Sequence, residues 1–266
     1  MTVTHLNEVF SKCASEKRAA FIPYVTAGYP NQAATVPQLL AMQEGGADII
    51  ELGMPFSDPL ADGPTIQKSS FIALQNGITV DDCMALVVKA RSQGLTTPVI
   101  LMGYYNPFAQ YGEQALVDAA AKATVSGFII VDVCGAEAKS FAALCNLKDL
   151  CMIPLVAPTS TEKRLAEIAE YASGYVYCVS VTGITGARSD LPPDLKDFLD
   201  RVRKFFKIPL AVGFGLNTRE HVAQVGKLAE GAVMGSIIIK TIEAAGQDVT
   251  SQCTALKNFV KSVTSD

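Results

Sequence analysis

Eight short apolar runs recur along this chain, and segments with helical spacing separate them. The runs are nearly continuous in apolar residues, which is typical of parallel strands covered on both faces. The predicted strands are Ala20–Thr26, Asp48–Met54, Pro98–Tyr104, Gly127–Val133, Met152–Ala157, Gly174–Val181, Pro209–Gly213 and Gly231–Ile238. A fold in which strand and helix alternate throughout is therefore expected.

The segments between the runs carry apolar residues at three- and four-residue intervals, as at Val36, Leu39 and Leu40. Thr79 and Asp82 have the spacing of a capping box. Eight strand–helix units in 266 residues match the usual size of a (β/α)8 barrel. The sequence predicts an α/β fold: a single TIM barrel domain over residues 1–266, with an extra amphipathic helix near the N-terminus.

A doubly wound open sheet is the alternative architecture. That fold would need a glycine-rich dinucleotide fingerprint or a P-loop after an early strand. Neither motif occurs in the sequence. The barrel is therefore the favoured architecture.

Composition and charge exclude several functional classes. The formal net charge is −4 without a Lys/Arg cluster, which argues against nucleic acid and anionic membrane as partners. No apolar run is long enough to span a bilayer. Seven irregularly spaced cysteines and two distant histidines indicate a reducing, cytoplasmic setting and no metal site. His5 and His221 are both expected at the surface.

Glycines lie within or just after the last three predicted strands. Strand seven ends at Gly213 and is followed by Gly215, strand eight contains Gly235 and Ser236, and Gly183 and Gly186 follow strand six. Many barrels bind phosphate through such loops and a helix N-terminus, where backbone N–H groups approach the oxygens. The joint placement favours a phosphate site over glycines that serve only in tight turns.

Strand two and its loop bring three carboxylates into twelve residues: Glu51, Asp58 and Asp62. Glu51 lies within an apolar strand, where burying an ionised carboxyl costs several kcal/mol, so it is expected to be protonated, paired or catalytic. An outward-facing Glu51 is the structural alternative. The set fits either Mg²⁺ binding or acid/base catalysis, and the residues alone leave both open.

Several segments resemble the signature of the tryptophan synthase alpha chain family, in family order and spacing. They are Glu51–Thr65, Pro23–Pro30, Leu101–Pro107, Val156–Thr159, Thr182–Arg188 and Val212–Gly215. The resemblance covers about residues 19 to 240, and the first segment alone is highly specific. It implies a lyase that splits indole-3-glycerol phosphate into indole and D-glyceraldehyde 3-phosphate in tryptophan biosynthesis.

The resemblance also implies the roles of individual residues. Glu51 matches the general acid that protonates indole C3, and Asp62 matches the aspartate that holds the indole N–H. Tyr177 matches a tyrosine near Glu51, and Thr185 belongs to a loop that closes over substrate. The phosphate-binding positions are Gly186, Gly215, Gly235 and Ser236, and the indole-pocket positions are Tyr24, Met102, Tyr104, Ile129 and Val131.

No cofactor is implied for this chain, because the pyridoxal phosphate of this step belongs to the beta subunit. That subunit is the implied partner in an α2β2 complex, with docking through Pro55–Pro64 and Asn106–Pro107. One departure is the loop Val131–Gly135, where the family usually has Pro-Asp-Leu-Pro. The missing prolines predict a freer turn and an altered contact with the beta chain.

Three other functions stay open at this point. The altered loop motivates a stand-alone lyase that releases free indole. A non-catalytic barrel that binds phosphate as an allosteric partner is disfavoured by the intact carboxylates. The third alternative is a different phospho-sugar isomerase or aldolase. A Schiff-base aldolase would need a lysine at a strand end, and none lies at the eight predicted strand ends, since Lys240 comes later, in a helical stretch.

Overall fold

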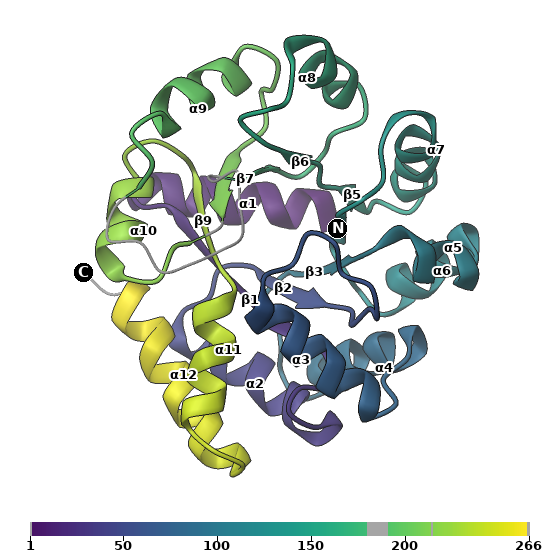
Figure 1. Cartoon of the computed structure of the whole chain (residues 1–266), viewed down its shortest axis with the longest axis vertical. Helices are drawn as coiled ribbons and strands as arrows, with labels where there is room; N and C mark the ends of the chain where they lie inside the picture. The colour runs from purple at the N-terminus through teal and green to yellow at the C-terminus, as the bar shows by residue number, and fades with distance from the viewer. Residues whose placement is uncertain (1, 180–190, 214, 265–266) are drawn as a thin grey trace.

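The computed structural model describes residues 2–179, 191–213 and 215–264, with side chains from His5 onward, and their strands form one parallel barrel (Figure 1). The strands lie in the order β5-β4-β3-β2-β1-β9-β8-β7-β6. Their bounds are β1 Ala20–Thr26, β2 Ile50–Gly53, β3 Val99–Gly103, β4 Gly127–Ile130, β5 Cys151–Met152, β6 Leu155–Val156, β7 Val176–Val179, β8 Leu210–Gly213 and β9 Gly231–Met234. Each described strand pair is parallel, as the continuous apolar runs predict.

The two shortest strands, β5 and β6, are halves of the fifth barrel strand. Ile153 N–H donates to the Phe128 carbonyl at 2.9 Å, and the Pro154 carbonyl accepts from Tyr177 N–H at 2.9 Å. This segment therefore joins β4 on one side to β7 on the other and closes the barrel. Pro154 has no N–H for the ladder, which accounts for the interruption. The predicted eight-stranded barrel is confirmed.

The predicted end of strand eight was wrong. The apolar run Gly231–Ile238 holds strand β9 only to Met234, and helix α11 begins at Ser236. Ile238 and Ile239 are buried on that helix. A short apolar run is compatible with either a buried strand or a buried helix. The apolar pattern alone therefore did not locate the boundary between β9 and α11.

Helices surround the barrel, and the first of them lies across one of its ends (Figure 1). They are α1 Thr2–Ser15, α2 Gln32–Gly45, α3 Pro64–Gln75, α4 Val80–Ser92, α5 Tyr105–Tyr111, α6 Glu113–Lys122, α7 Gly135–Asn146, α8 Glu162–Ala169, α9 Leu195–Arg203, α10 Arg219–Val225, α11 Ser236–Ala244 and α12 Val249–Thr264. The predicted capping box at Thr79 and Asp82 begins α4. Within the described residues no single helix could cross a membrane, and the pair α3 and α4, bent by 95° at its break, passes only by length and composition.

The extra N-terminal helix, α1, packs against the barrel interior. Its buried residues Leu6 and Phe10 belong to the same apolar cluster as Ile22 and Ile100 of the strands. The Phe10 ring lies 5.7 Å from the ring of Tyr175, measured between centroids. Helix α1 therefore covers one end of the barrel core, and the expected extra helix is confirmed.

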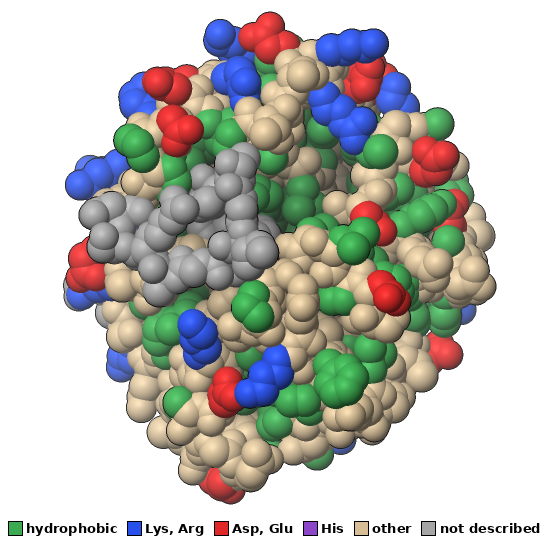
Figure 2. All heavy atoms as spheres, in the orientation of Figure 1, with side chains coloured by type: hydrophobic (Ala, Val, Ile, Leu, Met, Phe, Trp, Pro, Cys, Tyr) green, Lys and Arg blue, Asp and Glu red, His purple; other side chains and the backbone are tan. Residues whose placement is uncertain are grey.

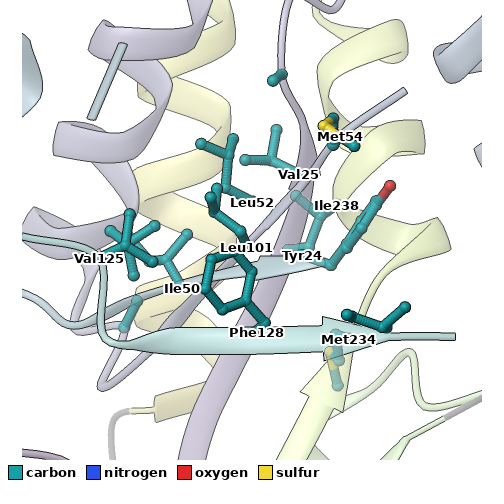
Figure 3. Packing of buried hydrophobic residues seen from close by; sticks show 14 of the residues in the cluster. Tyr24, Val25, Ile50, Leu52, Met54, Leu101, Val125, Phe128, Met234 and Ile238 are labelled. Atoms are coloured by element: carbon teal, nitrogen blue, oxygen red, sulfur yellow. The ribbon is translucent and has the colours of Figure 1, made fainter. Parts of the chain in front are cut away.

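A second apolar layer lies between the strands and the surrounding helices (Figure 3). Val25, Leu52 and Leu101 belong to it, whereas Ile22 and Ile100 of the same strands face the interior. This division follows from the two-residue period of a strand. Phe128 packs edge-on against Phe141, with ring centroids 5.2 Å apart. Both faces of the sheet are thus buried, which leaves the strand ends as the place for a site.

Helix α12 packs along α2, so a helix from the end of the chain lies beside one from its first fifth (Figure 1). The buried side chains of Gln38 and Gln252 share a hydrogen bond of 3.1 Å between the two helices. Lys257 pairs with Glu44 at 2.9 Å nearer the surface. The last helix is therefore an integral part of the barrel wall.

Candidate active site

A cavity of about 260 Å³ opens at the carboxyl ends of the strands. Its lining residues come from both halves of the chain: Tyr24, Glu51, Asp62, Gly63, Thr65, Ile66, Met102, Tyr177, Gly215, Leu216, Asn217, Thr218, Val233, Gly235, Ser236, Ile237 and Lys240. Figure 2 shows a hollow near the centre of the molecule, with hydrophobic side chains along its wall. This is the end of a barrel at which active sites form.

Glu51 lies on β2 and is fully buried, so the alternative of an outward-facing carboxyl was wrong. The Tyr175 hydroxyl donates to Glu51 Oε1 at 2.8 Å, whereas Oε2 has no partner among the described residues. Burial raises the pKa of Glu51 to about 8, and the hydrogen bond from Tyr175 opposes that rise. Glu51 is therefore a neutral acid at pH 7 that lines the cavity.

Asp62 lies in the loop after β2, and the side chain of Tyr104 fixes the position of this loop. The Tyr104 hydroxyl accepts a hydrogen bond of 3.0 Å from Ala61 N–H and donates to the Asp62 carboxylate. Phe56 stacks on Tyr104 with ring centroids 5.2 Å apart. Burial raises the pKa of Asp62 to about 6, against the lowering effect of Tyr104. Asp62 is thus mostly ionised at pH 7, while Glu51 is not.

Two tyrosines of the cavity wall lie over glycines of the neighbouring strands. A Cβ added at Gly53 would lie 2.0 Å from the Tyr24 hydroxyl oxygen, and one at Gly213 would lie 2.2 Å from that of Tyr177. Gly53 pairs with Thr26, two residues after Tyr24, and Gly213 pairs with Val179, two residues after Tyr177. The same diagonal contact is therefore used twice, and it needs a residue without a side chain.

This contact makes Gly53→Ala a test of the cavity wall. The added methyl must displace the Tyr24 ring, and we expect a loss of about 1–3 kcal/mol in unfolding free energy. Activity should fall with it, because Tyr24 lines the cavity. Urea unfolding and kinetics would measure both losses. Gly226→Ala is the control, since its Cβ would meet only ordinary contacts at 3.4 Å or more. Equal stability and activity in the two variants would contradict the packing described.

The glycine-rich end of the cavity contains three of the four predicted phosphate positions. Gly215 has a φ of +84° and lines the cavity, and a Cβ there would meet no atom of the described residues within 4 Å. Gly235 precedes α11, and Ser236 is the first residue of that helix. Backbone N–H groups at a helix start favour an anion. Gly186 and Thr185 lie outside the described residues.

The predicted indole-pocket residues are divided between the cavity and its supports. Tyr24 and Met102 line the cavity. Ile129 is fully buried in the barrel interior, and Val131 is half-buried just beyond β4, where its N–H donates to the Gly103 carbonyl at 3.0 Å. Tyr104 holds the Asp62 loop, as described above. The assigned roles of these five residues stay predictions.

Sequence reasoning missed Tyr175, the hydrogen-bond partner of Glu51. It lies two residues before Tyr177, and the two-residue period of a strand places both on the inner face of the barrel. His221 was also placed wrongly at the surface. It is 3 % exposed, and its Nδ1 accepts from Asn217 N–H at 3.3 Å, because α10 turns this side chain toward the loop after β8.

No group of three or more potential metal ligands gathers anywhere in the part of the chain that the structure describes. Asp58 is exposed and accepts a hydrogen bond of 2.5 Å from Ser57 Oγ, and it does not line the cavity with Glu51 and Asp62. The carboxylates therefore favour acid/base work over Mg²⁺. Their pKa values, displaced to different extents, are typical of a catalytic pair.

The family model described as Tryptophan synthase alpha chain matches residues 10–265. The chain belongs to the tryptophan synthase alpha chain family. It is therefore a relative of lyases that serve tryptophan biosynthesis. The resemblance noted in the sequence and the barrel fold are both confirmed by this match.

Relatives and solved structures agree with the family assignment. The chain is 43% identical over 241 residues to the tryptophan synthase alpha chain of Roseiflexus castenholzii, covering 92% of that protein. It is 50% identical over 235 residues to tryptophan synthase of Saccharomyces cerevisiae but spans only 33% of that protein's length. Tryptophan synthase subunit alpha from Legionella pneumophila superposes with a TM-score of 0.88 at 34% identity, over 97% of this chain and 96% of that one.

Proposed function

We propose that this chain cleaves indole-3-glycerol phosphate to indole and D-glyceraldehyde 3-phosphate, as the alpha subunit of tryptophan synthase. The observation that carries the proposal is the pair of carboxyl groups lining one cavity. Glu51 is protonated at neutral pH, with one oxygen that has no hydrogen-bond partner among the described residues, and Asp62 is mostly ionised. A retro-aldol reaction on an indole needs one acid and one anion of this kind.

Each group has a distinct step in the proposed mechanism. Glu51 donates its proton to indole C3, which makes the ring an electron sink. Asp62 accepts a hydrogen bond from the indole N–H and stabilises the positive charge that develops there. The Glu51 carboxylate left by the first step then takes the proton of the glycerol hydroxyl next to the ring, which returns Glu51 to its acid form. The carbon–carbon bond breaks, and its electron pair restores the neutral indole. The departing fragment becomes the aldehyde.

The other parts of the cavity support this reaction. Gly215, Gly235 and Ser236 would hold the substrate phosphate, with Gly186 as a fourth position, and Thr185 would contribute to closure over the substrate. Tyr24, Met102, Tyr104, Ile129 and Val131 would shape the indole pocket, and Tyr177 would pack beside Glu51. No cofactor is required for these steps.

A partner completes the proposal. The chain would work with a tryptophan synthase beta subunit in an α2β2 complex in the cytoplasm, docking through the loops at residues 55–64 and 106–107. Leu60 is 94% exposed in the first of these loops, as a docking residue would be before the partner binds. Pyridoxal phosphate would belong to the beta subunit.

The test is indole release from indole-3-glycerol phosphate by the purified chain, alone and with a beta subunit. Slow release alone and strong stimulation by the beta subunit are expected. Fast release that the beta subunit does not change would favour a stand-alone lyase. No release under either condition would contradict the proposal and favour a non-catalytic barrel.

Asp62→Asn is expected to lower kcat by about 10²–10³-fold, the usual cost of one preorganised charge-stabilising group. Asparagine keeps the shape and one acceptor oxygen but loses the negative charge. KM should change little, because the positive charge develops only in the transition state. Asp197→Asn, at an exposed carboxylate on α9 outside the cavity and the docking loops, is the matched control. A kcat within threefold of wild type for Asp62→Asn would contradict the role given to Asp62.

A further inference from the structure

Lys240 is a cation on the cavity wall without a carboxylate partner among the described residues. It lies on α11 with Ser236 and Ile237, and all three line the cavity. Residues three and four positions apart share one face of a helix, which explains why these three do so. The acid on the next turn, Glu243, is bound to Lys68 of α3 instead.

The charges around the cavity make this lysine distinctive. Among the described lining residues, two are acids, Glu51 and Asp62, and Lys240 is the single lysine or arginine. A phosphate ester entering the cavity meets the negative field of Asp62 and of a chain whose net charge is −4. One ammonium group on the cavity wall would offset that repulsion.

Helix geometry places the ammonium within reach of the glycine-rich end. Four residues of α-helix rise about 6 Å, and helical side chains lean toward the N-terminus. The flexible four-carbon stem of Lys240 is therefore long enough to bring the ammonium back to Ser236 and the start of α11. Gly215 and Gly235, whose backbones face the cavity, complete that end of the site.

We propose that Lys240 forms an ion pair with the phosphate of the substrate and selects phosphate esters over uncharged analogues. The inference rests on the proposed function and adds a side-chain cation to a phosphate site otherwise made of backbone N–H groups and one hydroxyl. Lys240 binds at a distance from the reacting carbon atoms. It therefore lowers KM and leaves the chemical step unchanged.

The test measures phosphate binding directly, by calorimetric titration of inorganic phosphate, beside steady-state kinetics on indole-3-glycerol phosphate. Lys240→Gln should weaken phosphate binding about tenfold, the usual worth of a hydrogen bond to a charged group. KM should rise by a similar factor while kcat stays within twofold, and added salt should narrow the difference. Lys240→Arg should restore most of the affinity.

Lys227→Gln is the matched control. This exposed lysine lies between α10 and β9, at the amino end of the strands, and removing it changes the net charge equally. Phosphate affinity that is the same in Lys240→Gln and Lys227→Gln would overturn the inference. So would a fall in kcat without a change in KM, or no phosphate binding by the wild-type chain.

The two proposals fail in different ways. If the wild type binds phosphate through Lys240 but releases no indole with or without a beta subunit, the proposed function is wrong and the phosphate contact stands. If the wild type releases indole and Lys240→Gln matches it in KM and phosphate affinity, the Lys240 inference is wrong and the lyase stands.

Discussion

Replacing Glu51 with glutamine should abolish nearly all lyase activity, lowering kcat by about 10³-fold within the range expected for a lost general acid. Glutamine keeps the volume of the side chain and an oxygen that accepts from the Tyr175 hydroxyl, but it has no proton to give to indole C3. The cavity and the binding of substrate should survive, so KM should stay within a few-fold. Indole release by the chain with a beta subunit is the measurement.

The pH profile gives a second readout of the same assignment. Because the Glu51 pKa is about 8 and the acid form is active, kcat/KM should fall above about pH 8. Because the Asp62 pKa is about 6 and the ionised form is active, kcat/KM should rise through about pH 6. A bell-shaped dependence of kcat/KM on pH, with its maximum between about pH 6 and about pH 8, is expected for the free enzyme. Glu137→Gln, at an exposed position on α7, is the control, and near-wild-type turnover by Glu51→Gln would contradict the mechanism.

The same substitution should make the fold more stable in alkaline solution. The ordinary pKa of glutamate is 4.5, whereas that of Glu51 in the folded chain is about 8, so the unfolded chain releases this proton first as pH rises. The contribution of Glu51 to the free energy of unfolding is therefore fully present below about pH 4.5. It is lost progressively as the pH rises from about 4.5 to about 8. Each pH unit of that window costs about 1.4 kcal/mol, or about 5 kcal/mol in all.

Glu51→Gln removes this cost because an amide does not ionise. Urea unfolding should give a free energy of unfolding several kcal/mol above wild type at pH 9, with a difference of at most about 1 kcal/mol at pH 5. Glu137→Gln again serves as the control. A stability difference between Glu51→Gln and wild type that does not change with pH would show that Glu51 is not a buried neutral acid.

The barrel was predictable because its strands carry a signal that depends little on context. Strands buried on both faces must be apolar at nearly every position, and glycine or capping residues such as Thr79 mark where helices begin or end. Errors arose where two structures share one pattern, as at Ile237 to Ile239, which are helical, and at Pro154, which interrupts the fifth strand. Those boundaries are decided by tertiary contacts and backbone donors.

The candidate site was predictable where a residue type is unusual for its sequence context. A carboxyl within an apolar strand identified Glu51, and glycines at three strand ends indicated the phosphate site. Tyr175 gave no such signal, because a tyrosine in an apolar strand reads as core. The sequence predicted correctly that Lys240 lies in a helix, but only the fold shows that this residue lines the cavity.

The contact between α2 and α12 has a consequence for how the chain is made. On the ribosome, α2 emerges early, while the helix that covers it is translated only after more than two hundred further residues. Until then, the buried amide of Gln38 lacks Gln252, and the apolar side of α2 is unprotected. The barrel wall therefore cannot be completed until the last helix has been made, and during that interval the side of α2 that faces α12 stays exposed to solvent and to non-native contacts.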